Sequence, residues 1–512
     1  MSTFLQDKSP TVVALLSLGG IYVAFQLVLY LAAAHRRSII SRNHGCKPIP
    51  RFPHRDPILG LDVFWENAKL ARDGGFLERV QSRYTQMGRY TFTQLFFGDA
   101  FIHTAEPANI KAVLATQFHD FELPPRRKAA FGPTFGHGIF TTDGKEWETS
   151  RALLRPNFTR SQVGDLVTFE RHIEKLIQRI PRDGSTVDLQ ELFFMLTMDS
   201  ATEFLFGSSS DVLGTDASRE RGVKFQDAFA CVTERTGLEA RVGKLATLLP
   251  DKGFQDSKSF VHEYIGDYIR RAVSLRKAEL VKRAEEDTSG RYVFLEELAK
   301  TSISEKKIQD ELLNILLAGR DTTASLLSYV FYMLARRKDV LEKLRREIDE
   351  LGNVAPTFEH LKSMKYLQYT LNEVLRLHPV VPSNTRICVK DTILPVGGGP
   401  DQKSPIFVKK GTSVAYQVYV MHRRRDLYGE DAEEFKPERW ETLRLGWHYL
   451  PFNGGPRICI GQQFALTEAA YTTVRLLQAF MGVEPRDDAP FTDLLSLTAA
   501  VRGGTKVAMI PA

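Results

Sequence analysis

A glycine-rich stretch around one cysteine, Phe452–Gly461 (FNGGPRICIG), constrains the fold of this chain more than any other feature. Glycines let a backbone approach a flat, bulky group because no Cβ stands in the way. The helix-like run Gln462–Glu468 follows, and free N–H groups at a helix start favour the thiolate of a nearby cysteine. Such a sulfur is typical of an axial ligand to haem iron. A buried free cysteine in a glycine-rich turn is the structural alternative.

The longest helical pattern runs from Glu305 to Arg336, and its apolar residues crowd several sides, which predicts a central buried helix. Its middle, Ala318–Thr323 (AGRDTT), breaks the local rules. Glycine costs about 1 kcal/mol relative to alanine in a helix interior, and Asp and Thr side chains compete for backbone hydrogen bonds. Such breaks often mark function. Glycine makes room for a ligand, and Asp321 with Thr322 forms a proton-delivery pair. A kink with a threonine bonded back to a carbonyl is the alternative.

Trp147 and Arg151 lie four residues apart after a predicted helix start at Asp143, so both face one side. An indole N–H and a guanidinium that point the same way suit a carboxylate. A cation–π or packing pair on a surface helix is the alternative.

Glu373 and Arg376 lie one turn apart on a predicted helix that ends before Pro379. An isolated pair of this kind is usually a solvated ion pair that contributes well under about 1 kcal/mol. A second arginine, Arg439, follows downstream in the stretch Phe435–Trp440 (FKPERW).

Near the N-terminus, residues 11–34 form an uncharged, mostly apolar run of 24 residues. A helix needs roughly 20 such residues to cross a bilayer. We predict a transmembrane anchor at 11–34, a basic and proline-rich linker at 35–59 and the globular body at 60–512. Arg36, Arg37 and Arg42 follow the run, and the positive-inside rule then places the body on the cytoplasmic side. A cleaved signal peptide is the alternative, because Ala32–Ala34 resembles a cleavage site.

The composition is that of an ordinary globular protein, with 43% hydrophobic and 25% charged residues among 512. No linker or repeat divides the chain after residue 60, which favours one large domain. The 4 cysteines are scattered without a Cys-x-x-Cys pair, which fits a reducing compartment. The net charge of +6 is dispersed, so no nucleic-acid partner is predicted.

Three shorter segments carry structural predictions. Alternation over 89–97 and 100–104 around Gly98-Asp99 predicts a hairpin. Residues 404–408 and 412–416 flank Lys409–Gly411 and predict a second hairpin. Residues 122–140, rich in proline, glycine and aromatic residues, predict a loop that lines an apolar cavity or packs on the surface.

The motifs occur together in the order and spacing of a known family. The pattern Phe-x-x-Gly-x-Arg-x-Cys-x-Gly, filled by Phe452, Gly455, Arg457, Cys459 and Gly461, resembles the haem-binding loop of the cytochrome P-450 superfamily at every fixed position. Four further motifs resemble the same family: Trp147/Arg151, Ala318–Thr323, Glu373/Arg376 and Pro437–Trp440. The resemblance covers the chain from about residue 45 to its end, and the one variation is Trp440, where phenylalanine is common.

This resemblance implies a fold that is mainly α with small β-sheets, namely a single haem domain behind an N-terminal membrane helix. It implies that Cys459 is the axial ligand of haem iron and that Asp321 and Thr322 deliver protons during oxygen activation. The haem propionates would contact Trp147, Arg151, Arg386 and Arg457. Phe452, Gly455 and Gly461 would shape the haem loop, and a buried triad of Glu373, Arg376 and Arg439 would hold that region.

Fine details of three motifs look like the fungal branch whose members hydroxylate n-alkanes and fatty acids: residues 317–324, 371–377 and 453–466. The expected function is monooxygenation of a C–H bond at or near the end of an aliphatic chain, with O2 and electrons from NADPH–cytochrome P-450 reductase. The expected location is the endoplasmic reticulum membrane. The same chemistry on a fungal secondary metabolite is the alternative. A haem-thiolate isomerase or a haem protein without oxygenase activity is a third hypothesis, which the pair Asp321-Thr322 disfavours.

Overall fold

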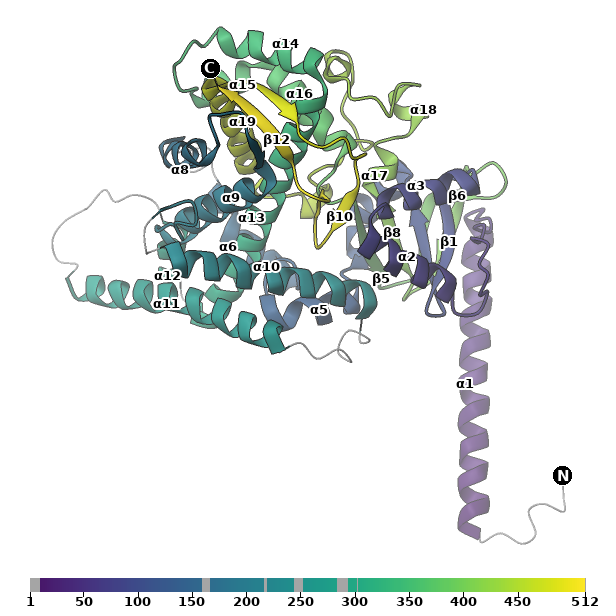
Figure 1. The fold of residues 1–512 in the computed structure, drawn as a ribbon. Coiled ribbons are helices and arrows are strands. Elements are labelled where there is room, and N and C mark those ends of the chain that lie inside the picture. The colour runs from purple at the N-terminus through teal and green to yellow at the C-terminus, as the bar shows by residue number, and fades with distance from the viewer. Residues whose placement is uncertain are drawn as a thin grey trace.

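The computed structural model describes residues 10–158, 166–215, 219–243, 252–282, 293–301 and 303–511. Within these ranges the fold is mainly helical with small sheets, as predicted (Figure 1). The α-helices are α1 Pro10–Asn43, α2 Leu61–Asp73, α3 Phe76–Met87, α4 Pro107–Lys111, α5 Pro125–Phe135, α6 Gly144–Leu154, α8 Leu166–Arg179, α9 Leu189–Phe206, α10 Arg219–Val242, α11 Lys252–Lys282, α12 Phe294–Ala299, α13 Glu305–Arg336, α14 Lys338–Asp349, α15 Phe358–Ser363, α16 Lys365–Leu377, α17 Val418–Met421, α18 Arg425–Tyr428 and α19 Gln462–Ala479.

The strands form one five-stranded, one three-stranded and two two-stranded sheets in the described ranges, with the orders β1-β2-β8-β5-β3, β4-β12-β9, β10-β11 and β6-β7. They are β1 Thr91–Phe96, β2 Asp99–Thr104, β3 Phe121–Glu122, β4 Thr186–Asp188, β5 Ser383–Cys388, β6 Thr392–Gly398, β7 Ser404–Val408, β8 Ser413–Gln417, β9 Phe480–Pro485, β10 Asp493–Leu495, β11 Ala499–Val501 and β12 Lys506–Pro511.

Helix α13 is the central helix that its all-round apolar pattern predicts. Ser304 caps its start, because the Ser304 hydroxyl oxygen accepts a hydrogen bond from the Lys307 backbone N–H. The helix packs against α9, α11, α16 and α19, so most of its 32 residues are buried on every side. Two large apolar clusters meet along it. A side chain in the middle of α13 is therefore placed by contacts from several directions.

Helix α1 projects from the body on its own (Figure 1). Residues Ala14–Asn43 have a mean hydropathy of 1.9 over the most apolar window, which is not buried at all, and in the described ranges this is the one helix long and apolar enough to cross a membrane. The helix continues past Ala34 to Asn43, so the first residues of the predicted linker are helical. The rest of that linker is bonded to the body: the N–H groups of Lys47 and Phe52 donate to Pro405 (2.9 Å) and Thr93 (2.8 Å).

One predicted hairpin is confirmed and one is wrong. Strands β1 and β2 pair antiparallel around Gly98. Strands β7 and β8 do not pair with each other, because β7 pairs with β6 and β8 lies between β2 and β5. Gly411, with φ of +87°, turns the chain between the two sheets. Both edges of β8 bond to distant strands, and this non-local pairing leaves no edge for its neighbour in sequence.

The predicted loop at 122–140 is also wrong over much of its length, because Pro125–Phe135 forms helix α5. Pro125 occupies the first helical position, where its fixed φ suits the helix and its missing N–H would have no partner. Pro133 falls in the last turn, and the helix ends two residues later. The helix start places Arg126 and Arg127 side by side near the five-stranded sheet.

Candidate haem-thiolate site

The cysteine loop is folded back on itself just before α19. Gly455–Arg457 forms a single 3-10 turn, and the Cys459 N–H donates to the carbonyl of Phe452 across 3.0 Å. Asn453 adopts a left-handed φ of +63°. Its side-chain oxygen accepts from the Tyr416 hydroxyl (3.1 Å), and its Nδ2 donates to the Arg457 carbonyl (3.2 Å). The loop therefore holds Cys459 in a fixed place between strand β8 and helix α19.

The glycines of the loop have different structural roles. Gly455 has φ of +66°, and a Cβ there would lie 1.9 Å from the carbonyl oxygen of Leu114. Leu114 belongs to the π-helical turn Ala112–Thr116, so Gly455 is required for packing of two protein segments. A Cβ on Gly461 would lie 3.7 Å from the Phe158 ring, which is an ordinary contact. The glycines in the sequence predicted a close approach of another group to this backbone. The structure shows such an approach at Gly455, and the approaching group is the backbone of Leu114.

Cys459 combines accessibility with an interior position. Its side chain is solvent-accessible, but the protein atoms packed around the thiol still remove part of its hydration, and this desolvation raises the pKa of Cys459 above its usual range. The Gly461 N–H and the nearby Arg151 charge oppose that rise in pKa. A thiolate at this position is thus favoured by a bound cation, and a metal ion supplies such a charge.

The middle of α13 is uncovered on one face only. Ala318, Gly319 and Thr322 are partly exposed, whereas their neighbours along the helix are buried. The spacing i, i+1, i+4 puts these three residues on one side. The Thr322 hydroxyl donates to the Ala318 carbonyl across 2.7 Å, as the kink alternative predicted. A Cβ on Gly319 would lie 3.6 Å from the Cβ of Ala201, so this glycine also borders α9.

Asp321 is buried beside Arg320, whose Nη1 donates to Asp321 Oδ1 across 2.6 Å. Burial raises the pKa of the Asp321 carboxyl, and the Arg320 charge opposes this rise. The Arg320 guanidinium stacks on the Phe194 ring at 4.9 Å, and the Arg320 carbonyl accepts from the Thr197 hydroxyl at 2.9 Å. The acid is therefore oriented from the α9 side of the helix.

Three guanidinium groups lie near one another, and one of them, Arg457, belongs to the cysteine loop. Arg386 donates to Asn384 Oδ1 (3.0 Å), and Arg127 donates to the same oxygen (3.3 Å). Arg457 donates to Asp143 Oδ1 across 2.5 Å. Burial, followed by repulsion from Arg386, lowers the pKa of Arg127 to about 10, and burial lowers that of Arg457 to about 10. Arg386 is buried and the other two arginines are partly buried, and together these three cations favour a further anionic group.

Trp147 and Arg151 lie on α6, and Asp143 is the residue before it. Trp147 is buried and carries two guanidinium groups on its ring, Arg457 at 4.5 Å and Arg151 at 5.8 Å. The predicted pair therefore meets a third predicted residue, Arg457. Arg127 also belongs to this group, although the sequence patterns do not single it out, because residues 122–140 predict a loop. Pro124-Pro125 before two arginines is the one sequence signal of a helix start there.

Glu373, Arg376 and Arg439 are brought together and buried. Arg376 donates Nε and Nη2 to the two oxygens of Glu373, each across 2.8 Å. Arg439 Nε lies 3.4 Å from Glu373 Oε1, and its Nη1 donates to Asp431 across 2.7 Å. The Trp440 indole N–H donates to Glu373 Oε2 across 3.0 Å. The one variation noted in the motif thus adds a hydrogen bond that phenylalanine cannot make.

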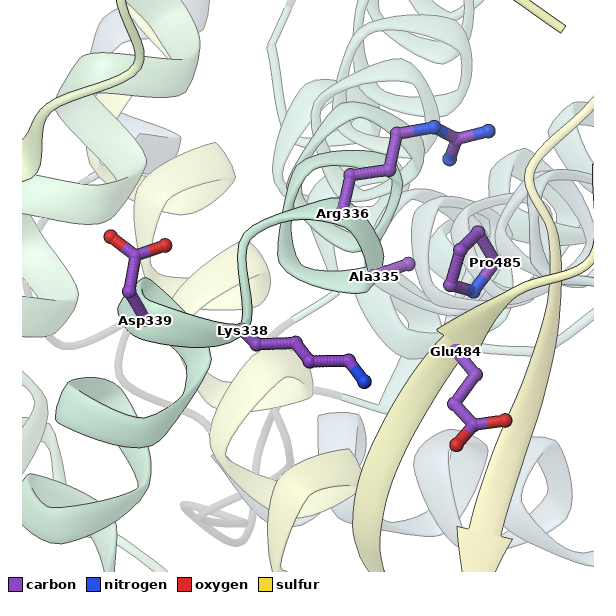
Figure 2. A pocket seen from close by; sticks show the side chains of 6 residues that line it. All are labelled: Ala335, Arg336, Lys338, Asp339, Glu484 and Pro485. Atoms are coloured by element: carbon purple, nitrogen blue, oxygen red, sulfur yellow. The ribbon is translucent and has the colours of Figure 1, made fainter. Parts of the chain in front are cut away.

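A hollow of about 650 Å³ lies elsewhere, between the end of α13 and β9 (Figure 2). Figure 2 shows charged side chains around it, with Lys338 and Glu484 on two different elements. Ala335 in its wall is thirteen residues along α13 from Thr322, or roughly 20 Å. Its charged lining and its distance from Thr322 along α13 set it apart from the site described above.

The donor set fits a haem. An accessible thiol, one uncovered helix face and a group of buried guanidinium ions suit an iron ion, a flat ring and two carboxylates respectively. The family model described as Cytochrome P450 matches residues 57–503 of this chain. The chain belongs to the cytochrome P450 family. The resemblance seen in the sequence is thereby confirmed, and the protein is a monooxygenase with a haem-thiolate cofactor.

Similar proteins agree with this assignment. Cytochrome P450 monooxygenase himC from Aspergillus japonicus is 44% identical over 98% of this chain and 92% of its own length. Cytochrome P450 52A13 from Debaryomyces hansenii is 43% identical over 94% of this chain and 96% of its own. The crystal structure of the cytochrome P450DA heme domain has a TM-score of 0.76 at 20% identity, over 91% of this chain and 98% of that chain. Membership implies O2, a redox partner and a hydrophobic substrate.

Proposed function

We propose that this cytochrome P450 hydroxylates a fatty acid, an n-alkane or a similar aliphatic chain at or near its end. The accessible Cys459 thiol, held inside the body beside Arg151, is the observation that carries the assignment to haem-thiolate chemistry. The aliphatic substrate rests on the resemblance of residues 317–324, 371–377 and 453–466 to the fungal branch with that activity. Ala318 and Gly319 offer an apolar surface on the uncovered face of α13, which suits an alkyl chain.

The proposed cofactor contacts follow from the donor set. Cys459 would bind the iron, and Arg386, Arg457 and Arg127 would bind the propionates, with Trp147 and Arg151 beside them. Charge-assisted bonds from guanidinium to carboxylate are short and directional, so they would fix the plane of the ring. When bound, the haem activates O2 and supplies the oxidant that attacks a C–H bond.

Proton delivery is proposed for Asp321 and Thr322. The Asp321 carboxyl has a raised pKa from burial, so it can hold a proton closer to neutral pH than an exposed aspartate. The Thr322 hydroxyl lies one residue further along α13, on the uncovered face, where it can pass a proton onward. Arg320 restrains the carboxyl from the other side and would have to release it for the transfer.

The proposed electron donor is NADPH–cytochrome P-450 reductase, which would dock on the face near Cys459. Helix α1 would anchor the protein in the endoplasmic reticulum membrane, with the body on the cytoplasmic side. The apolar length of Ala14–Asn43 and the arginines after residue 35 support this arrangement.

A second candidate function is the same chemistry on a larger secondary metabolite. The relative himC from Aspergillus japonicus, which is described only as a monooxygenase, is as similar as the relative 52A13. A panel of C12–C18 fatty acids and alkanes, added to reconstituted protein and reductase, separates the two candidates. Turnover with a substrate-induced spectral shift supports the aliphatic assignment, and the absence of both across the panel contradicts it.

The haem-thiolate assignment has its own test. The reduced protein with carbon monoxide should show the thiolate-type band, and Cys459→Ala should lose it. A wild-type protein without that band would refute the proposed ligand.

A further inference from the structure

Asn453, six residues before the proposed iron ligand Cys459, has a backbone conformation that residues with side chains rarely adopt. Its φ of +63° lies in the left-handed region, where glycine is the usual residue and asparagine is tolerated. Glycine occupies positions 454, 455 and 461 of the same loop, but position 453 keeps a side chain. Such an outlier within a site points to a role for that side chain.

The Asn453 amide makes two hydrogen bonds that fix which way it faces. The carbonyl oxygen of Arg457 lies 3.2 Å from Nδ2 and can only accept, so Nδ2 is the donor there. Oδ1 then faces the Tyr416 hydroxyl, which donates to it across 3.1 Å. The amide therefore closes the loop across the 3-10 turn Gly455–Arg457 and ties that turn to a residue outside the loop.

Tyr416 is a rigid point of attachment for this amide. It lies on β8, where Thr104 of β2 and Asn384 of β5 are its partners in register, so both edges of its strand are occupied. Its side chain is only 1% exposed. A group on an interior strand is placed more precisely than a group on a loop. The Tyr416 hydroxyl thus fixes the position of Asn453, and not the reverse.

The same tyrosine stands among the three arginines proposed for the propionates. The Arg386 guanidinium lies 5.9 Å from the centre of the Tyr416 ring. Burial raises the pKa of Tyr416, and the charges of the three arginines oppose that rise. The Asn384 side-chain oxygen accepts from both Arg386 and Arg127. Asn384 in turn is the residue paired with Tyr416 across the sheet, so Tyr416 connects the arginine group to the cysteine loop.

The turn that Asn453 closes leads directly to the sulfur. The Ile458 N–H donates to the Gly455 carbonyl across 3.0 Å, and the Cys459 N–H donates to the Phe452 carbonyl across 3.0 Å. The position of Cys459 therefore follows from that of the turn. Groups behind a metal ligand orient it toward the metal. Because a haem would be held by its propionates on one side and by the sulfur on the other, the arginine group and the loop must stay in register with each other.

We propose that Tyr416 and Asn453 are positioning residues for the thiolate ligand. The Tyr416 hydroxyl holds the Asn453 amide, and the amide holds the turn that places Cys459 relative to the arginine group. This inference rests on the proposed haem contacts and adds two residues that act through Cys459. Tyr416→Phe tests it with little disturbance, because phenylalanine removes the hydroxyl and keeps the ring that packs beside Arg386.

The test uses the full-length, haem-loaded protein, reduced and under carbon monoxide. Its readout is the rate at which the thiolate-type band is lost, because this band reports the bond between iron and sulfur. Tyr416→Phe should lose the band about tenfold faster than wild type, which corresponds to about 1.4 kcal/mol and is the size of one hydrogen bond. Asn453→Gly keeps the left-handed backbone without strain but lacks the amide, and it should show a similar increase. An unchanged rate in either variant would overturn the proposal.

The double variant Tyr416→Phe/Asn453→Gly tests whether the tyrosine acts through the amide. If it does, removal of the hydroxyl has no further effect once the amide is gone. The double variant should then lose the band at the rate of Asn453→Gly alone. A further large increase in the double variant would refute the amide as the link between Tyr416 and the loop.

Tyr471→Phe is the matched control for a general loss of stability. Tyr471 is 2% exposed, and its hydroxyl donates to Glu170 Oε2 across 2.7 Å, a bond that joins α19 to α8. Its band should be lost within about twofold of the wild-type rate, because the bond is independent of the loop. An increase equal to that of Tyr416→Phe would count against the proposal. The wild-type band itself tests Cys459 as the ligand, so a failure of that assignment appears in the wild-type protein and a failure of this inference only in the variants.

Discussion

Glu468 is a carboxyl group that the fold should retain in its protonated form. It lies on α19, is 1% exposed, and accepts a hydrogen bond from the Ser200 hydroxyl of α9. Its second oxygen has no hydrogen-bond partner in the described structure. Burial raises the pKa of Glu468 from 4.5 to about 8. We predict that Glu468→Gln stabilises the protein above pH 5, because glutamine keeps an acceptor for Ser200 and needs no proton.

The magnitude follows from proton linkage. Between pH 4.5 and about 8 the folded wild-type protein binds a proton at Glu468 that the unfolded chain has released, so its free energy of unfolding falls as pH rises. The fall is roughly 1.4 kcal/mol per pH unit, or on the order of 5 kcal/mol over the whole interval. Below pH 4.5 the Glu468 carboxyl is protonated in both the folded and the unfolded protein, so it does not change the free energy of unfolding. Above about pH 8 it is ionised in both, and the loss of free energy of unfolding stays constant. At pH 7 the expected advantage of glutamine is about 3 kcal/mol.

The assay is a parallel unfolding series of wild type and Glu468→Gln from pH 5.5 to 8.5, followed by near-ultraviolet circular dichroism. All other titrating groups are shared, so they cancel in the difference between the two proteins. The difference should grow with pH and level off near pH 8, whatever the packing cost of the amide. A difference that does not change with pH would refute the reasoning, because it would show that Glu468 titrates normally in the fold.

Three further predictions concern the haem-loop region. Trp440→Phe should lower the free energy of unfolding by about 1.5–3 kcal/mol, because the buried carboxylate of Glu373 loses one donor. Denaturant titration measures this loss, and Trp447→Phe is the comparison, because Trp447 is a partly buried tryptophan in an apolar cluster. Gly455→Ala should cost at least about 3 kcal/mol and yield protein with little haem, because its Cβ would overlap the Leu114 carbonyl; the Soret absorbance per mole of protein measures the haem content. Arg386→Gln should release haem about 10–100-fold faster to a haem-scavenging protein while the thiolate-type carbon monoxide band persists; an unchanged release rate would remove Arg386 from the propionate contacts.

The sequence alone determined the features whose physical cause is local. The all-round apolar pattern of Glu305–Arg336 gives a helix that must be buried, and the apolar length of residues 11–34 gives one that cannot be. The spacing of Glu373 and Arg376 puts them within reach of each other on any helix. Motif identity then placed the cysteine loop in its family, and the family match agrees.

Only the tertiary structure decided the features that depend on partners far away in the chain. Strand β8 pairs with β2 and β5 and not with its sequence neighbour β7, because both of its edges are then hydrogen-bonded and no edge remains for β7. Gly455 is required by the carbonyl of Leu114, more than three hundred residues earlier, and the burial of Glu468 is set by α9. The helix and strand propensities of neighbouring residues do not predict such contacts, because burial and hydrogen-bond partners are set only when distant segments pack together. The cysteine loop could be recognised from ten residues, and Arg386 and Arg457 could be named with it. The place of Arg127, the pairing of Arg457 with Asp143 and the contact of Gly455 with Leu114 required the fold.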